Sequence, residues 1–125
     1  LAMGADGGYA GSAFIATKEA NAAAAYKQMI ATHAAEDIVY TNLFTGVHGN
    51  YLKSSIRNQG LDPENLPESD PSKKNFSGGS AKPKSWKEIW GSGQGIGAIK
   101  EIQPTADMIA RLKSEYVAAR ARLAV

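Results

Sequence analysis

Cysteine is absent from the 125 residues of this sequence. Its absence excludes disulfide bonds, cysteine-ligated zinc, iron–sulfur clusters and a cysteine nucleophile. A chain without cysteine is compatible with a reducing compartment, and we expect a cytoplasmic protein. Long apolar runs are absent too, because none reaches the roughly 18 residues of a membrane span. The first residues lack the charged and apolar regions of a signal peptide, so the sequence predicts no membrane partner.

An excess of charge of one sign is also lacking. The 14 basic and 12 acidic residues leave a formal net charge of +2, whereas a nucleic-acid-binding domain is expected to carry a clustered basic face. We therefore expect no nucleic-acid partner. Histidine is scarce, since His33 and His48 are the two in the chain. They form no paired cluster, and the sequence predicts no metal site.

Hydrophobic residues make up 43% of the sequence, which is enough for one core in a chain of this length. The chain opens Leu1-Ala2-Met3-Gly4, without an initiator methionine, and recognisable patterns begin at once. We interpret residues 1–125 as a single partial domain, entered from the middle of a longer protein.

Short extended segments and one long loop are expected between the helices. Tyr9 and Ala10 indicate a strand near residues 8–11, and the β-branched and aromatic residues at 38–40 favour a second extended segment. Residues 61–84 hold four prolines, a Gly-Gly pair and several serines. This composition predicts an irregular loop, which is unusually long for a compact domain.

Three helices are predicted from apolar spacing and from the absence of glycine and proline. The first is alanine-rich with Thr17 as its N-cap, the second is followed by Gly60 as its C′ residue, and the third begins at Thr105. The expected helices cover about residues 18–35, 50–58 and 105–123.

A glycine and a serine mark the first candidate ligand site. Gly11-Ser12 follows the predicted strand and precedes a helix. Backbone N–H groups at such a junction can bind a phosphate, helped by the serine hydroxyl and the helix dipole. Glycine allows close approach because it has no Cβ. Most turns of this kind have no ligand, so the pattern alone is a weak indication.

A second glycine-rich segment runs over residues 91–97. It fails the dinucleotide pattern G-x-G-x-x-G in both registers, and it lacks the lysine of a P-loop. One interpretation is a flexible turn. The other is a loop that lies under a planar ligand, with Gly93 allowing close approach and Gln94 acting as amide donor and acceptor.

The histidines and tryptophans are better explained by structure than by chemistry. His33 falls near the end of a predicted helix, and His48 lies between glycine-containing loop residues with no carboxylate or serine partner in sequence. Trp86 and Trp90 have helical spacing and are expected in the core, although their place beside the second glycine-rich segment also allows a pocket wall.

Taken in order, these residues resemble the nitronate monooxygenase family, formerly called 2-nitropropane dioxygenases. The likeness is an ordered set of short motifs rather than one decisive signature. The matching motifs are Gly4-Ala5-Asp6-Gly7, Gly11-Ser12-x-Phe14-x-Ala16-Thr17-x-Glu19-Ala20, Tyr26-Lys27, Phe44-Thr45-Gly46, Trp90-Gly91-Ser92-Gly93-Gln94-Gly95-Ile96-Gly97 and the final helix with Glu115-Tyr116.

The resemblance implies an α/β fold, namely the C-terminal part of a (β/α)₈ TIM-type barrel that is mostly helical as an isolated piece. It implies FMN as cofactor, with Gly11 and Ser12 at its phosphate and with Gly93 and Gln94 near the flavin. The substrates would be a small nitronate-like molecule and O₂. The family's catalytic histidine lies in an upstream Gly-Gly-His stretch, so we expect no catalytic residue in this chain. The oligomeric state is not predicted.

Departures from the family pattern concern the substrate more than the cofactor, and two alternatives to the family assignment remain open. Many members have arginine where this chain has Ala13, and a basic run where it has residues 47–50. The chain could belong to a related FMN barrel reductase of the enoyl-reductase type, which would consume NAD(P)H. It could also be a non-catalytic helical interaction module, which would unfold cooperatively by itself. A partial barrel, in contrast, is expected to aggregate because it exposes apolar helix faces.

Overall fold

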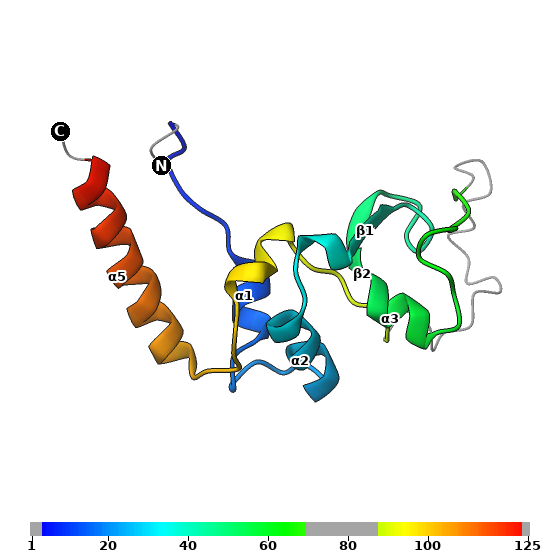
Figure 1. Cartoon of the computed structure of the whole chain (residues 1–125), viewed down its shortest axis with the longest axis horizontal. Coiled ribbons are helices and arrows are strands. Elements are labelled where there is room, and N and C mark those ends of the chain that lie inside the picture. Colours follow the sequence, from blue (N-terminus) through cyan, green and yellow to red (C-terminus); the bar gives the residue numbers. More distant parts are fainter. Residues whose placement is uncertain (1–3, 70–87, 124–125) are drawn as a thin grey trace.

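The computed structural model describes residues 4–69 and 88–123. In Figure 1 a hairpin and a short helix lie at one end, small helices form the middle, and a long helix projects at the other end. The elements in chain order are α1 (Gly11–Ile15), α2 (Ala24–Thr32), the 3₁₀ helix η1 (Ala35–Asp37), β1 (Ile38–Thr41), β2 (Gly49–Leu52), α3 (Lys53–Asn58), the 3₁₀ helix η3 (Gln94–Ala98) and α5 (Thr105–Leu123).

Strands β1 and β2 form an antiparallel hairpin, with Ile38 opposite Leu52. The extended segment predicted at residues 38–40 is therefore confirmed. The chain returns to the free edge of β2 after residue 88. The Leu52 N–H donates to the Trp90 carbonyl at 2.8 Å, and the Ser92 N–H donates to the Asn50 carbonyl at 3.1 Å. This pairing anchors the second glycine-rich segment to the hairpin.

The core joins three parts of the chain that are distant in sequence. Ile30 of α2, Leu52 of β2 and Ile96 of η3 have no exposed surface, and they pack with Ala16 and Ile99 in one cluster. Burying an aliphatic side chain of this size contributes roughly 1.5–3 kcal/mol. The hydrophobic effect therefore holds α1, α2, the hairpin and η3 together.

Two aromatic rings extend this core toward the hairpin. Tyr26 and Trp90 stack with ring centroids 5.0 Å apart, and the Tyr26 hydroxyl donates to the Gly91 carbonyl. Burial raises the pKa of the Tyr26 hydroxyl. Trp90 therefore belongs to the edge of the core, whereas Trp86 lies outside the described residues.

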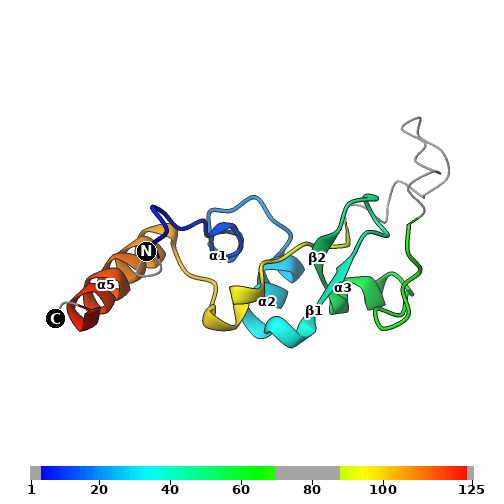
Figure 2. The same ribbon diagram turned by 90° about the horizontal axis from the view of Figure 1, so that it is seen from above.

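Helix α5 has the bounds predicted from the sequence. Figures 1 and 2 both show it projecting from the remaining elements. Met108 is its one buried residue. The apolar side chains along its length remain exposed, namely Ile109, Leu112, Tyr116, Val117 and Leu123. The first turn is fixed by Glu19, whose carboxylate accepts from the N–H and the hydroxyl of Thr105 at 2.9 and 2.8 Å.

The strand predicted near residues 8–11 is wrong. Residues 7–10 are exposed and belong to no element, and α1 begins at Gly11. A strand is stabilised by a paired neighbour, and Tyr9 instead projects fully into solvent. The β/α barrel itself is not formed by the described residues, which show a mixed arrangement of helices with one two-stranded sheet.

The first predicted helix is too long. It begins at Ala24 rather than near residue 18, because the backbone after α1 pairs elsewhere. Thr17 forms a parallel bridge with Gln103, and the Lys18 N–H donates to the Gln103 carbonyl. The Lys27 ammonium then binds the carbonyls of Thr17 and Lys18. Thr17 is therefore not an N-cap.

The second predicted helix is partly a strand. Residues up to Leu52 belong to β2, and only Lys53–Asn58 is helical. Gly60 follows this helix with a φ of +78°, as expected of a C′ glycine. Residues 61–69 hold turns without a helix or strand. The rest of the predicted 61–84 loop, from residue 70 on, lies outside the described residues.

Replacing Ile96 with alanine tests the role of the η3 anchor. Because Ile96 is fully buried, we expect Ile96→Ala to lower the free energy of unfolding by about 2–5 kcal/mol in urea denaturation. Val47→Ala is the control, since Val47 is mostly exposed and its truncation is expected to change stability by less than about 0.5 kcal/mol. Equal losses in the two variants would show that η3 is not a core element.

The Glu19 carboxylate is expected to make stability depend on pH. Its hydrogen bonds from Thr105 hold its pKa below the usual value of 4.5. Its stabilising contribution is therefore present above that value and disappears as the pH falls through the lowered pKa. Glu19→Gln keeps an acceptor without the charge. The stability advantage of the native protein over this variant should shrink between about pH 5 and pH 3, and a constant difference in thermal unfolding would contradict it.

Candidate functional site

The two glycine-rich segments meet in space although they are far apart in the sequence. The Gly93 N–H donates to the Ser12 hydroxyl oxygen at 2.8 Å, across 81 residues. The elements η3 and α1 are in contact, and the yellow segment with η3 overlaps α1 in Figure 1. The candidate site is therefore the corner between the start of α1 and the start of η3, and it holds all four residues selected from the sequence: Gly11, Ser12, Gly93 and Gln94.

The second segment is ordered by its neighbours rather than by its own turn propensity. Gly91 pairs with Tyr51 of β2, Ser92 is buried, and Ile96 is fixed in the core. Gly93 has an extended backbone before η3 begins at Gln94. The segment is thus a strand-like edge followed by a 3₁₀ helix.

The two glycines of the corner have few neighbouring atoms. A Cβ on Gly93 would lie 3.4 Å from the Ser12 hydroxyl oxygen, and one on Gly11 would meet only a ring carbon of Tyr9 at 3.7 Å. The space above Gly11 is therefore accessible to a ligand. The N–H groups in the first turn of α1 have no partner within the helix, as at the start of every helix.

The Ser12 hydroxyl retains a donor for a ligand. Its oxygen accepts from Gly93, and a serine hydroxyl also has one hydrogen to donate. Within residues 4–69 and 88–123 no acceptor receives this hydrogen. A hydroxyl beside backbone N–H groups at the start of a helix is a combination of donors that can bind phosphate oxygens.

The corner is shallow. Gly11, Gly93 and Gln94 are exposed, and Ser12 is half-buried. The Gln94 side chain makes no hydrogen bond within the described part of the chain, so its amide is available as donor and acceptor. These residues form one side of a site for an anionic group, and they do not enclose a ligand.

Neither histidine lies at this corner. His33 ends α2, and its ring is hydrogen-bonded to Thr32 at 3.0 Å and to Ser54 at 2.7 Å. This confirms the structural interpretation of His33. His48 stacks on Tyr40 with centroids 4.9 Å apart, in the hairpin. Among the described residues, no group of His, Cys, Asp and Glu could hold a metal ion.

One positioning residue was missed by the analysis of the sequence. Lys27 lies on α2, and its ammonium binds the carbonyls of Thr17 and Lys18 at 2.7 and 3.1 Å. It therefore fixes the chain directly after α1 and so fixes the orientation of α1 at the site. Its place in the Tyr26-Lys27 motif was the available signal, but the motif did not indicate what the lysine contacts.

Comparison with known families agrees with the motifs. The family model described as nitronate monooxygenase matches residues 1–115. The chain belongs to the nitronate monooxygenase family. The matched range contains both glycine-rich segments, and the family is one of oxidoreductases. No curated protein and no solved structure matches the chain. No helix among the described residues is long and apolar enough to cross a membrane.

Proposed function

We propose that this chain is part of an FMN-dependent enzyme that oxidises nitronates to carbonyl compounds with O₂. The observation that carries the proposal is the contact between Ser12 and Gly93, in a chain of the nitronate monooxygenase family. The contact joins two motifs that are 81 residues apart in the sequence. The proposed ligands of the FMN phosphate are the Ser12 hydroxyl and the first N–H groups of α1.

The residues at the corner suit a phosphate. The open face of Gly11 permits close approach, and the free hydrogen of Ser12 adds a side-chain donor to the backbone donors. Hydrogen bonds to a charged acceptor contribute about 1.5–3 kcal/mol each. FMN has the dianionic phosphate that such donors favour, whereas riboflavin lacks it. The chemical fit therefore supports the phosphate assignment.

Each residue has a separate part in this proposal. The FMN isoalloxazine would supply the electron-transfer chemistry, as flavins do in general. Gly11 and Ser12 would bind and orient its phosphate. Gly93 holds the Ser12 hydroxyl by its N–H, and the exposed Gln94 amide would donate to or accept from the flavin or substrate. The base is expected outside this chain, because the family resemblance places the catalytic histidine in an upstream Gly-Gly-His stretch that neither His33 nor His48 matches.

The departures at Ala13 and at residues 47–50 concern the substrate. The second candidate is an enoyl-reductase-type flavin enzyme that uses a nicotinamide. The two candidates differ in what they consume. Oxygen uptake on addition of an alkyl nitronate supports the first, whereas NAD(P)H oxidation with an enoyl substrate and none with a nitronate supports the second.

A charge placed at Gly11 tests the phosphate assignment. Gly11→Asp puts a carboxylate into the proposed phosphate site, so we expect the Kd for FMN to rise at least about tenfold by fluorescence titration, a change of about 1.4 kcal/mol. The Kd for riboflavin should change little, because riboflavin has no phosphate. Gly7→Asp is the matched control, since Gly7 also lies in open space.

Ser12 supplies an independent comparison. Ser12→Ala removes the donor and the acceptor for Gly93, and Ser12→Thr keeps a hydroxyl. The assignment predicts weaker FMN binding in the alanine variant and recovery in the threonine variant. It is wrong if Gly11→Asp and Ser12→Ala leave the ratio of FMN to riboflavin affinity unchanged.

A further inference from the structure

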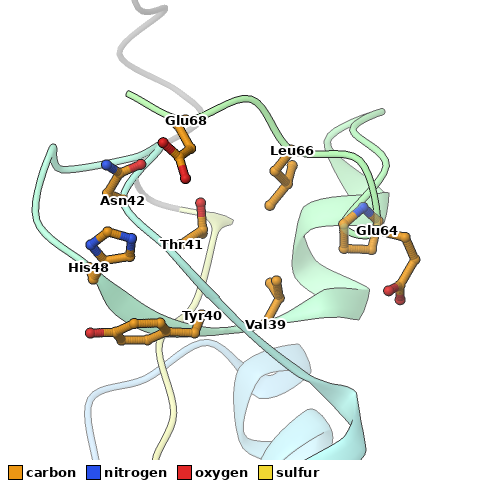
Figure 3. A pocket seen from close by; sticks show the side chains of 9 residues that line it. Val39, Tyr40, Thr41, Asn42, His48, Glu64, Leu66 and Glu68 are labelled. Carbon is orange, nitrogen blue, oxygen red and sulfur yellow. The ribbon is translucent and has the colours of Figure 1, made fainter. Parts of the chain in front are cut away.

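A hollow lies in another part of the molecule, away from the proposed cofactor corner. It has a volume of about 200 Å³ and is lined by β1, by His48 and by residues 63–68. Figures 1 and 2 place the hairpin well away from α1. Its floor is β1, from which the side chains of Val39 and Thr41 face the space in Figure 3.

The cover of the hollow is held in place by side chains. The Asn42 amide binds the backbone of Ser69 twice, accepting from its N–H at 2.9 Å and donating to its carbonyl at 3.3 Å. Asp62 accepts from the Glu64 N–H at 3.0 Å. Lys53 forms an ion pair with Glu64 at 2.9 Å. The covering segment is thus fixed at both ends above β1.

One carboxylate in the hollow, that of Glu68, has no partner among the described residues. Glu64 is neutralised by Lys53, but Glu68 has no ion pair or hydrogen bond within residues 4–69 and 88–123. Among the described residues that line the hollow, none is a lysine or an arginine. In Figure 3 the Glu68 carboxylate points down into the space, toward the Thr41 hydroxyl. A positive group placed there would gain both a charge partner and a hydrogen-bond acceptor.

The remaining walls of the hollow suit a small organic molecule. Val39, Pro63 and Leu66 are apolar lining residues, and Figure 3 shows Val39 and Leu66 on one side of the hollow. On the other side, His48 and Tyr40 are stacked on each other, with ring centroids 4.9 Å apart, and both line the hollow. The volume is below the roughly 300–1,000 Å³ of most drug-sized sites. The occupant should therefore be a short alkyl chain with one charged end.

We propose that this hollow binds a small organic ammonium ion, with Glu68 as its counter-charge and with the apolar wall against its alkyl chain. The carboxylate gives selectivity for a cation over a neutral molecule of the same shape. The two hydrogen bonds between Asn42 and Ser69 position Glu68. They need no contact with the ligand. The site is independent of the proposed flavin corner.

n-Butylammonium chloride is the probe, and the amide NMR signals of Thr41 and His48 report its binding. We expect saturable shifts with the native protein, and binding about fivefold weaker with 1-butanol, as one exposed charge pair gives. Glu68→Gln should remove the preference for the ammonium. Glu101→Gln is the matched control, because it makes the same change of charge at an exposed residue outside the hollow. Sodium chloride at equal concentration controls for ionic strength.

Two outcomes overturn the proposal. The first is the absence of saturable shifts at these residues up to about 50 mM n-butylammonium, well above the millimolar Kd of a weak small-molecule site. The second is an equal preference for the ammonium in Glu68→Gln and in the native protein. Loss of the preference in Glu68→Gln and its retention in Glu101→Gln support the site. The amide spectrum of each variant shows at the same time that it is folded.

Discussion

The pairing of residues 90–92 with the edge of β2 is the contact on which the remaining arrangement depends. Two backbone hydrogen bonds fix this stretch to Asn50 and Leu52, and the stacked ring of Trp90 holds it against Tyr26 of α2. The glycines that follow cannot then move as a free turn. Ile96 enters the core directly afterwards. A strand edge and one aliphatic side chain thus set the path of a segment whose own sequence would favour disorder.

The path of residues 90–96 determines the geometry of the candidate site. Because Gly93 lies between the paired edge and the buried Ile96, its N–H is held toward Ser12. The hydroxyl oxygen is occupied by this bond, and its hydrogen is left for a ligand. On the opposite side, Lys27 fixes the backbone after α1. The corner is therefore preorganised by contacts that lie outside it, and its glycines serve for access. Membership of the nitronate monooxygenase family gives this geometry its proposed use.

The sequence predicted the elements that depend on local residue pattern. It failed where hydrogen bonding between distant backbone segments decides the structure. Helix α5 follows from a long stretch without glycine or proline. The strand near residues 8–11 was wrong because a strand needs a partner. The sequence predicts a helix at residues 50–52 because no glycine or proline separates them from α3. In the structure these residues pair with β1 instead. Both glycine-rich segments were selected as candidates, but their contact across 81 residues is tertiary and has no local signal.

The most direct measurement is a glycine-selective ¹⁵N NMR titration of the protein with FMN and, separately, with riboflavin. The account predicts that the Gly11 amide shifts on binding FMN and much less on binding riboflavin, because only FMN brings a phosphate to the first turn of α1. Gly93 should move with it through Ser12, whereas Gly60, beyond α3, should not. Equal shifts of Gly11 with both flavins, or no shift while FMN binds, would contradict the account.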